Sequence, residues 1–302
     1  MDRIEAMAVF QRVAELGSFT QAAASLGLPR ASVSAAVRQL ETQLGTRLLH
    51  RTTRRVATTQ DGQVFYERCR DLLADLEELQ GLFSGQRAEL AGRLRVDLPS
   101  RIGRHQIIPH LPEFLAAHPR LEIELSTTDR LVDPVREGFD LVLRVGPLLD
   151  SSLVARPLGE LRMGSYAGPA YLERHGRPEN LADLAHHRLV HYAAVLGTRA
   201  DGFEYLDPTS GEVRSLPMAG VLTVNNSDAY QAACLAGLGI AQMPAISATS
   251  FVDDGRLAVV LPQLEVPPLP VTLLYPSRRH LPRRVRVFMD WLVAQIGPYL
   301  DG

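Results

Sequence analysis

The residues best suited to bind a polyanion lie between positions 30 and 38. They are cationic, hydroxylated or small, and helical spacing puts most of them on one stripe: Arg30, Ala31, Ser32, Ser34, Ala35 and Arg38. Small side chains let a helix approach the wall of a DNA groove, and arginines donate to phosphates and base edges. Ser18 and Thr20, at the start of the preceding predicted helix, join this candidate DNA-binding set.

A second basic group follows this stripe in the sequence. The apolar pair Leu48-Leu49 predicts a strand. The polar residues after it occupy a predicted hairpin that would lie along phosphates or in the minor groove: Arg51, Thr53, Arg54 and Arg55. The alternative is an ordinary three-helix bundle with an arginine-bearing loop. Because both basic groups fall in order within one short segment, the sequence favours binding to double-stranded DNA.

Two later segments could bind a small anion. Ser100-Arg101 follows a predicted strand and opens a helix, and Asn226-Ser227 does the same further along. Each helix start offers free N–H groups and a partial positive charge, so two of them opposed across a cleft would hold an anion. Ser227 would also serve as a plain helix cap, and that alternative stays open.

Further candidate ligand contacts lie where predicted strands end: Thr127, Thr128, Arg144, Gly146 and Tyr192. Arg144 could pair with a ligand carboxylate in bidentate fashion, or it could neutralise Asp140 or Asp150 of the chain itself. A small organic anion is the predicted ligand class.

Catalytic and metal chemistry have little support. His186, His187 and His191 cannot all face one point on a regular element, and no cysteine or paired carboxylate completes a metal site. The sequence contains no GxSxG, phosphate-binding glycine loop or HExxH motif. Cys69 and Cys234 sit in apolar helical patterns and are predicted to be buried thiols rather than a redox pair. We therefore expect no enzyme activity, cofactor or metal.

A helix-turn-helix would position the first basic group. Ser18, with Gln21 three residues later, predicts a capping box. Gly27 supplies a sharp turn before Pro29. The apolar face of the next helix is predicted from helical spacing: Val33, Val37, Leu40 and Leu44. An earlier helix that carries Ile4, Met7, Phe10 and Val13 would pack on it.

A long helix is predicted from a break at residues 59–62 to about Gln86. Its apolar residues recur at heptad spacing: Phe65, Cys69, Leu72, Leu76, Leu79 and Phe83. A seam on a helix between two domains is best buried against a second copy, so we expect a homodimer; packing on the chain's own domain is the alternative. Ser84-Gly85-Gln86 begins a predicted hinge.

After Gly92 the pattern alternates between strands and helices, which predicts helix-covered parallel sheets. The predicted strands are 94–98, 121–125, 141–143, 163–166, 189–192, 221–224, 240–243 and 271–275. The predicted helices are 100–118, 132–137, 169–175, 181–186, 227–236, 245–250 and 281–296. Two α/β lobes joined by two crossovers would form a clamshell with a cleft at the strand ends.

Composition agrees with a multidomain globular protein. The chain has 302 residues, 46% hydrophobic and 22% charged, and a net charge of −2. Residues 1–60, however, carry eight arginines against four acids, a local basic module suited to phosphates. The N-terminus is acidic rather than signal-like, and no apolar run is long enough to span a membrane. The expected location is the cytoplasm, with no membrane partner.

Three segments identify a family resemblance: MAVFQRVAELGSFTQAAASLGL, SVSAAVRQLETQLGTRLLHRTTR and TTQDGQVFYERC. They resemble the winged helix-turn-helix of LysR-type transcriptional regulators, and a weaker likeness continues to the C-terminus. Pro29 and Arg30 stand where many members carry Ser and Gln, and Ala35 and Ala36 replace commonly polar residues. Base preference therefore cannot be carried over from other members.

The resemblance implies an α/β protein with an all-α N-terminal module. We expect a winged helix-turn-helix (1–60), a linker and dimerisation helix (61–90) and a two-lobed effector-binding domain similar to type 2 periplasmic binding proteins (91–302). Lobe I would span about 91–161 and 268–302, and lobe II about 162–267. In the family, residues at the strand ends line the effector cleft, which supports Ser100, Thr127 and Arg144. The resemblance also implies tetramers, with RNA polymerase as a candidate partner.

Two other classes of protein compete with this interpretation. A solute-binding transport protein would share the two-lobed architecture, but it would need a secretion signal and would have no use for a basic N-terminal module. An enzyme would need a nucleophile–base pair or a metal centre in the cleft. The sequence favours a transcriptional regulator that responds to a small-molecule effector.

Overall fold

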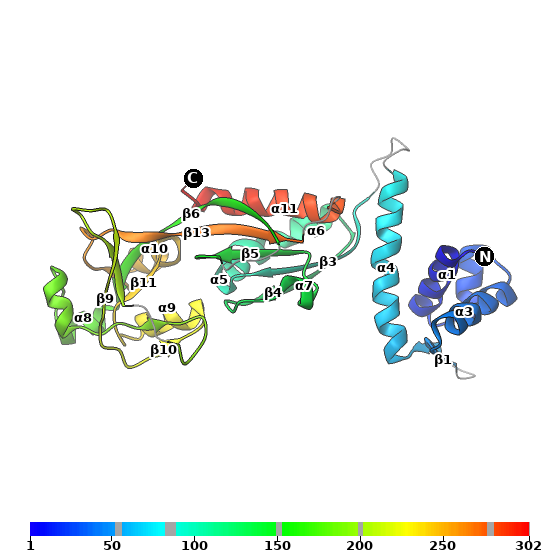
Figure 1. The fold of residues 1–302 in the computed structure, drawn as a ribbon, viewed down its shortest axis with the longest axis horizontal. Coiled ribbons are helices and arrows are strands. Elements are labelled where there is room, and N and C mark those ends of the chain that lie inside the picture. The colour runs from blue at the N-terminus through cyan, green and yellow to red at the C-terminus, as the bar shows by residue number, and fades with distance from the viewer. Residues whose placement is uncertain (52–55, 82–88, 149–152, 199–201, 277–280, 302) are drawn as a thin grey trace. The chain divides into compact units, whose positions relative to one another are not determined.

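The computed structural model describes residues 1–51, 56–81, 89–148, 153–198, 202–276 and 281–301 (Figure 1). The chain divides into two compact units. The first unit comprises Met1–Arg93 with His118–Glu122, and the second comprises Leu94–Ala117 with Ile123–Gly302.

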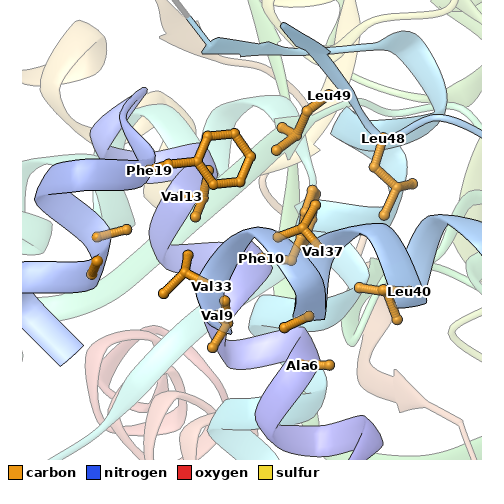
Figure 2. Packing of buried hydrophobic residues seen from close by; sticks show 13 residues of the cluster. Ala6, Val9, Phe10, Val13, Phe19, Val33, Val37, Leu40, Leu48 and Leu49 are labelled. Atoms are coloured by element: carbon orange, nitrogen blue, oxygen red, sulfur yellow. The ribbon is translucent and has the colours of Figure 1, made fainter. Parts of the chain in front are cut away.

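The first unit begins with helices and a hairpin around one apolar core. Its elements are α1 (Arg3–Leu16), α2 (Phe19–Leu26), α3 (Arg30–Leu44) and the antiparallel strands β1 (Leu49–Arg51) and β2 (Val56–Thr58). Figure 2 shows how side chains from all three helices and β1 meet in this core: Ala6, Val9, Phe10, Val13, Phe19, Val33, Val37, Leu40, Leu48 and Leu49. The expected helix-turn-helix with its hairpin is confirmed.

The predicted apolar face of α1 was partly wrong. Phe10 and Val13 are buried as expected, but Ile4 is 43% exposed, whereas Ala6 and Val9 are buried. Positions 6, 9, 10 and 13 form a stripe with helical spacing, and Ile4 lies outside it. Size and apolarity alone therefore placed Ile4 on the wrong face.

The turn between α2 and α3 is built as predicted, apart from one bond. Ser18 accepts the N–H of Gln21 at 3.3 Å. The Gln21 side chain makes no return bond to the backbone N–H of Ser18, so the predicted capping box does not form. Gly27 has φ +65° and ends α2 in the left-handed conformation, where glycine meets no steric penalty. Val33, Val37 and Leu40 of α3 are buried, and Leu44 packs at the edge of the core.

Helix α4 (Gln60–Gly81) starts earlier than predicted. Thr59 accepts the N–H of Gly62 at 2.9 Å and so caps the helix, which makes 60–62 helical rather than a break. Gly62 is required there, because a Cβ would lie 1.8 Å from the carbonyl oxygen of Leu48. The predicted end near Gln86, the seam residue Phe83 and the hinge at 84–86 lie outside the described residues.

The second unit contains a mixed sheet, not the parallel sheets expected. Its strand order is β11-β6-β13-β5-β3-β4, with β12 also on β6. The strands are β3 (Ala91–Leu98), β4 (Arg120–Thr127), β5 (Leu141–Val145), β6 (Val154–Ala167), β11 (Ala241–Pro244), β12 (Ala258–Val259) and β13 (Val266–Tyr275). β3 and β5 are parallel, but β13 is antiparallel to both β5 and β6. The two crossover strands run in opposite directions, and this makes the sheet mixed.

Strands β6 and β13 run side by side from one lobe to the other (Figure 1). The first lobe carries β3, β4 and β5, and the second carries β11 and helix α9 (Ser227–Leu235). The stretch rich in proline before the predicted strand 271–275 belongs partly to β13. Pro267 and Pro268 lie where the register shifts between Val266 and Leu269, a place where missing N–H donors are tolerated.

The predicted helix 100–118 is interrupted. It consists of α5 (Ser100–Ile102), a π-turn (Gly103–Ile107), a 3₁₀ turn (Ile108–His110) and α6 (Leu111–Ala117). Pro109 and Pro112 provide no N–H, which prevents a regular hydrogen-bond ladder. The remaining helices agree with prediction to within a few residues: α7 (Pro134–Glu137), α8 (Pro169–His175), the 3₁₀ turn Leu181–His186, α9, α10 (Ala245–Asp253) and α11 (Arg283–Ile296), after which a 3₁₀ turn follows at Gly297–Tyr299.

The hairpin of β8 (Phe203–Leu206) and β9 (Val213–Leu216) was not predicted. Its signal is the turn Asp207-Pro208-Thr209-Ser210-Gly211, in which Asp207 accepts the N–H groups of Thr209 and Ser210 at 2.8 and 3.2 Å. Two further short strands, β7 (His191–Tyr192) and β10 (Thr223–Val224), pair in parallel. They lie within the predicted strands 189–192 and 221–224.

Candidate DNA-binding surface and ligand cleft

Helix α3 presents the predicted basic stripe to solvent. Arg30, Ala31, Ala35 and Arg38 are exposed, Ser32 and Ser34 are half-buried, and the apolar residues face the core. On α2, Thr20 is exposed and Ser18 is half-buried by its capping role. The structure therefore gathers the predicted residues of α2 and α3 on two helices joined by one tight turn.

The start of α3 lacks the usual negative charge. Its first turn contains no acid, its first residue is Arg30, and Pro29 supplies no side-chain cap. A cation at the positive end of a helix dipole is unfavourable within the chain, and an external anion would relieve this. Among the described residues, neither Arg30 nor Arg38 has an ion-pair partner, so both charges are available for binding.

The predicted hairpin forms, with His50 opposite Ala57 and Arg51 opposite Val56. Thr53, Arg54, Arg55 and the side chain of Arg51 lie outside the described residues. Their contribution to DNA binding stays a prediction.

The second unit contains a cavity of about 630 Å³. Predicted ligand-contact residues in its wall are Arg101, Thr128, Arg144, Gly146, Tyr192 and Ser227. Most of the remaining wall is apolar, including Ile102, Leu131, Val145, Leu161, Met163, Tyr230, Met243 and Ile246. A cavity of this size with a few polar groups suits a small organic molecule with an apolar body.

Arg144 pairs within the chain, with an acid that was not among those expected. Its Nη2 lies 2.7 Å from Oδ2 of Asp97, a fully buried carboxylate, and Nη1 donates to the Leu143 carbonyl oxygen at 2.9 Å. Asp140 instead accepts the N–H of Arg95 at 3.0 Å, and Asp150 lies outside the described residues. β3 and β5 pair directly, which brings Asp97 and Arg144 together.

The two predicted helix starts do face a carboxylate, but it belongs to the chain. Asp129 accepts the N–H of Ser100 at 2.9 Å and the N–H of Ser227 at 2.5 Å. Three predicted residues do not line the cavity: Ser100, Thr127 and Asn226. Ser100 is buried and its hydroxyl donates to the Thr127 carbonyl oxygen at 3.4 Å, and Asn226 donates to the Ser100 hydroxyl at 3.4 Å.

Several cavity residues were missed by sequence reasoning. Asp129, Gln106 and Gln231 line the cavity, and Gln231 accepts from Arg101 at 2.7 Å. Asp129 follows the predicted Thr127-Thr128 strand end directly, a signal that could have included it. Gln106 and Gln231 lie inside predicted helices, so nothing in their spacing marked them.

Unpartnered polar atoms also lie in the cavity wall. Nε of Arg101, Oε1 of Gln106 and Oγ of Ser227 are buried without a hydrogen-bond partner among the described residues. Buried polar atoms normally have partners, so these three are candidates to contact a ligand. Tyr192 is held neutral, because burial raises the pKa of its hydroxyl to about 12.

Of the three histidines weighed as a metal site, His187 packs in the core beside Tyr171, whereas His186 is exposed. The Tyr171 hydroxyl accepts the N–H of Arg188 at 2.7 Å and lies 3.2 Å from Nδ1 of His187, to which it can donate. His187 is buried, and burial lowers the pKa of its imidazole. Within the described ranges, no group of three His, Cys, Asp or Glu residues is arranged to hold a metal.

The thiols agree with their prediction. Cys69 and Cys234 are free and buried, and burial raises their pKa values to about 11 and about 12. Among the described helices, none has both the length and the apolar character that a bilayer span requires.

Comparison with known proteins covers both units. The family described as "Bacterial regulatory helix-turn-helix protein, lysR family" matches residues 4–63, and "LysR substrate binding domain" matches residues 87–297. The HTH-type transcriptional regulator YhjC of Escherichia coli (strain K12) is 46% identical over 100% of both chains. An HTH-type transcriptional repressor of Pseudomonas aeruginosa (strain UCBPP-PA14) is 40% identical over 97% of this chain and 92% of its own. The structure of CrgA, a LysR-type transcriptional regulator from Neisseria meningitidis, aligns with TM-score 0.61 and 29% identity over 97% of this chain and 98% of that one.

Proposed function

The chain belongs to the LysR family of transcriptional regulators, with a DNA-binding module and an effector-binding domain, and from this premise we propose how it binds its two kinds of partner. The DNA partner is promoter DNA, contacted by the exposed face of α2 and α3 and by the basic hairpin. The effector is a small molecule held in the cavity of the second unit. A transport role is not supported, because the relatives are transcriptional regulators along their whole length.

The observation that carries the DNA proposal is the uncompensated charge at α3. Arg30 begins a helix that has neither an acid in its first turn nor a side-chain cap. An external anion would relieve this arrangement, and in helix-turn-helix proteins the N-terminal part of the second helix enters the major groove. Arg30 would therefore contact a base edge or a phosphate near it, and the hairpin arginines would contact the backbone.

Fluorescence anisotropy tests this proposal. The purified chain is titrated into labelled DNA from the region beside its own gene, with scrambled competitor and at several salt concentrations. We expect binding that survives the competitor and weakens steeply as salt rises. Binding that the competitor abolishes would remove sequence specificity for that DNA, and no binding to any DNA at low salt would contradict the proposal.

We further propose that α4 pairs two copies of the chain, with tetramers formed from these dimers. Phe65 packs against Phe10 of its own chain, with ring centroids 5.5 Å apart. Leu72 and Leu79, in contrast, are 50% and 54% exposed. A second copy of α4 would bury this exposed part of the seam. Paired half-sites on DNA also require a two-fold protein.

Leu72→Asp tests the pairing. Because Leu72 is exposed in the single chain, the change leaves the fold intact and places a charge in the proposed interface. We expect light scattering to report monomers where the unmodified chain is a dimer or tetramer. Val64→Asp, on another exposed residue of the same helix outside the seam, is the control. An unchanged mass for Leu72→Asp would exclude this face.

For the effector we propose a small organic anion with an apolar body. The apolar wall would hold the carbon skeleton, and the unpartnered Nε–H of Arg101 and hydroxyl of Ser227 would donate to the anionic group. Gln106 could accept from a hydroxyl on the ligand. A thermal-shift screen of aromatic and aliphatic acids beside their neutral amides tests the class. Stabilisation by amides but not by acids would contradict it.

The remaining assignments follow the same premise. We propose the domain boundaries 1–60, 61–90 and 91–302, the cytoplasm as the place of action, and RNA polymerase as a further partner at the promoter. No catalytic role is proposed.

A further inference from the structure

One carboxylate bonds to backbone groups of both lobes of the second unit. Asp129 lies in the loop after β4, in the first lobe. Its Oδ1 accepts the N–H of Ser100, which begins α5 in the same lobe, at 2.9 Å. Its Oδ2 accepts the N–H of Ser227, which begins α9 in the second lobe, at 2.5 Å. One side chain therefore holds a backbone donor from each lobe.

Both donors are groups that their helices cannot satisfy. The first N–H groups of a helix have no partner within it. In α9, Asn226 Oδ1 accepts the N–H groups of Asp228 and Ala229 at 2.9 and 3.0 Å, which leaves the N–H of Ser227 to Asp129. In α5, Pro99 occupies the cap position and provides no side-chain acceptor. Asp129 therefore completes both caps at once.

Other polar contacts between the lobes lie beside this carboxylate. Arg101 of the first lobe donates to Asp228 at 2.9 Å and to Gln231 at 2.7 Å, both on α9. The Arg101 side chain is largely buried, and burial lowers the pKa of its guanidinium. These contacts form a polar strip along the lobe junction, and Asp129, Arg101, Ser227 and Gln231 of this strip also line the ligand cavity.

We propose that Asp129 is an interlobe latch: its carboxylate holds the starts of α5 and α9 together and so stabilises the closed arrangement of the lobes around the cavity. A carboxylate suits this task, because it has two acceptor oxygens for two donors that approach from opposite lobes. An amide at this position would replace one of the two oxygens with an NH₂ group, which cannot accept the N–H that it faces.

The latch would regulate ligand access to the cavity. Without it, a smaller fraction of molecules is closed, and a ligand that needs the closed arrangement binds more weakly in proportion to that fraction. A consequence of weaker ligand binding for transcription rests on the proposed function, whereas the latch itself can be measured without DNA.

A purely local role for Asp129 is the competing explanation. If Asp129 only capped α5, its removal would loosen residues 100–103 and leave the start of α9 unchanged. The chain offers a matched control in Asp133, which caps α7 within one lobe by accepting the N–H groups of Val135 and Arg136 at 3.1 and 3.0 Å.

Amide hydrogen exchange of the full-length chain tests the latch. In Asp129→Ala we expect the N–H groups at the starts of both α5 and α9 to exchange about tenfold faster, the factor associated with a charge-assisted hydrogen bond. Asp133→Ala should change neither. Faster exchange at α5 with no change at α9 would overturn the proposal.

Rescue by acetate sharpens the test. In Asp129→Ala, acetate can enter the vacated position, so it should slow exchange at both helix starts, whereas chloride at the same ionic strength should not. In the unmodified chain acetate should have no effect at these positions. Should Asp129→Ala fail to fold, Asp129→Asn takes its place and should lose protection at the start of α9; unchanged protection there would overturn the latch. If the unmodified chain binds no DNA while acetate rescue holds, the latch stands and the proposed function fails.

Discussion

The arginines of α3 and those of the ligand cleft lie in opposite electrostatic surroundings. Arg30 and Arg38 are exposed and, within the described residues, have no acidic partner. Arg144 is 8% exposed and pairs with the fully buried Asp97, and Arg101 pairs with Asp228 between the lobes. The same residue type is thus left uncompensated on α3 and neutralised in the ligand cleft.

This difference separates binding from folding. An exposed arginine without a partner keeps its full charge for a phosphate or base and adds little to stability. A buried arginine that pairs with a buried acid has its charge compensated within the chain, and removal of one partner leaves an isolated charge in a poorly solvated place. Substitutions of Arg30 and Arg38 should therefore change DNA affinity alone, and substitutions at the Asp97 pair should change stability first.

The largest effect is expected for Arg144→Met. It leaves the Asp97 carboxylate buried without its cation, so the free energy of unfolding should fall by about 3–5 kcal/mol. Urea unfolding of the full chain, followed by circular dichroism, measures this change. The double variant Asp97→Asn with Arg144→Met should recover much of the loss. Equal stability of Arg144→Met and the unmodified chain would break the comparison.

Arg30→Ala should have a smaller effect, of a different kind. We expect it to weaken binding to the preferred DNA by about 1–3 kcal/mol and to relax base preference, with no change in unfolding. Arg54→Ala, in the predicted phosphate-binding hairpin, should weaken binding to all DNA sequences alike. Anisotropy with matched and mutated DNA measures both. A uniform loss for Arg30→Ala would move this residue to the phosphate-contacting class.

The smallest effect is expected from the buried imidazole of His187. Burial lowers its pKa in the folded chain below the ordinary 6.5, so the unfolded chain takes up the proton first as pH falls. The contribution of the neutral His187 imidazole to the free energy of unfolding is complete above pH 6.5, and it declines as the pH falls through the lowered pKa. His187→Asn keeps an acceptor for the Tyr171 hydroxyl but cannot titrate. Its melting temperature should decline less between pH 7.5 and pH 5.5; an equal decline would exclude His187 as the source.

The helix-turn-helix of α2 and α3 was predictable because its signals are local. A cap at Ser18, a left-handed glycine at Gly27 and an apolar period of three and four through Leu40 each depend on neighbours in sequence. The exposed stripe of α3 followed directly, since a residue that is not on the buried face of a surface helix faces solvent. Ile4 is the exception, because two neighbouring stripes of α1 are apolar and only packing selects between them.

The cleft was less predictable, because its contacts join residues far apart in the chain. Thr128, Arg144 and Ser227 were found from the rule that strand ends and helix starts face a cleft. The partner of Arg144 depended on which strands are adjacent, and Asp97 could not be chosen over Asp140 before the pairing of β3 and β5 was known. The polar contacts of Asp129 and Gln231 likewise appear only when both lobes are in place.

The sequence by itself determined the winged helix-turn-helix, the two-lobed α/β domain and the basic face of α3, since these depend on periodicity, capping and local charge. Only the tertiary structure decided which charges are compensated. The mixed sheet puts Arg144 against Asp97, and the meeting of two lobes puts the Asp129 carboxylate between the starts of α5 and α9. The physical reason is the short range of hydrogen bonds and buried ion pairs, which form between atoms about 3 Å apart wherever the fold brings them together.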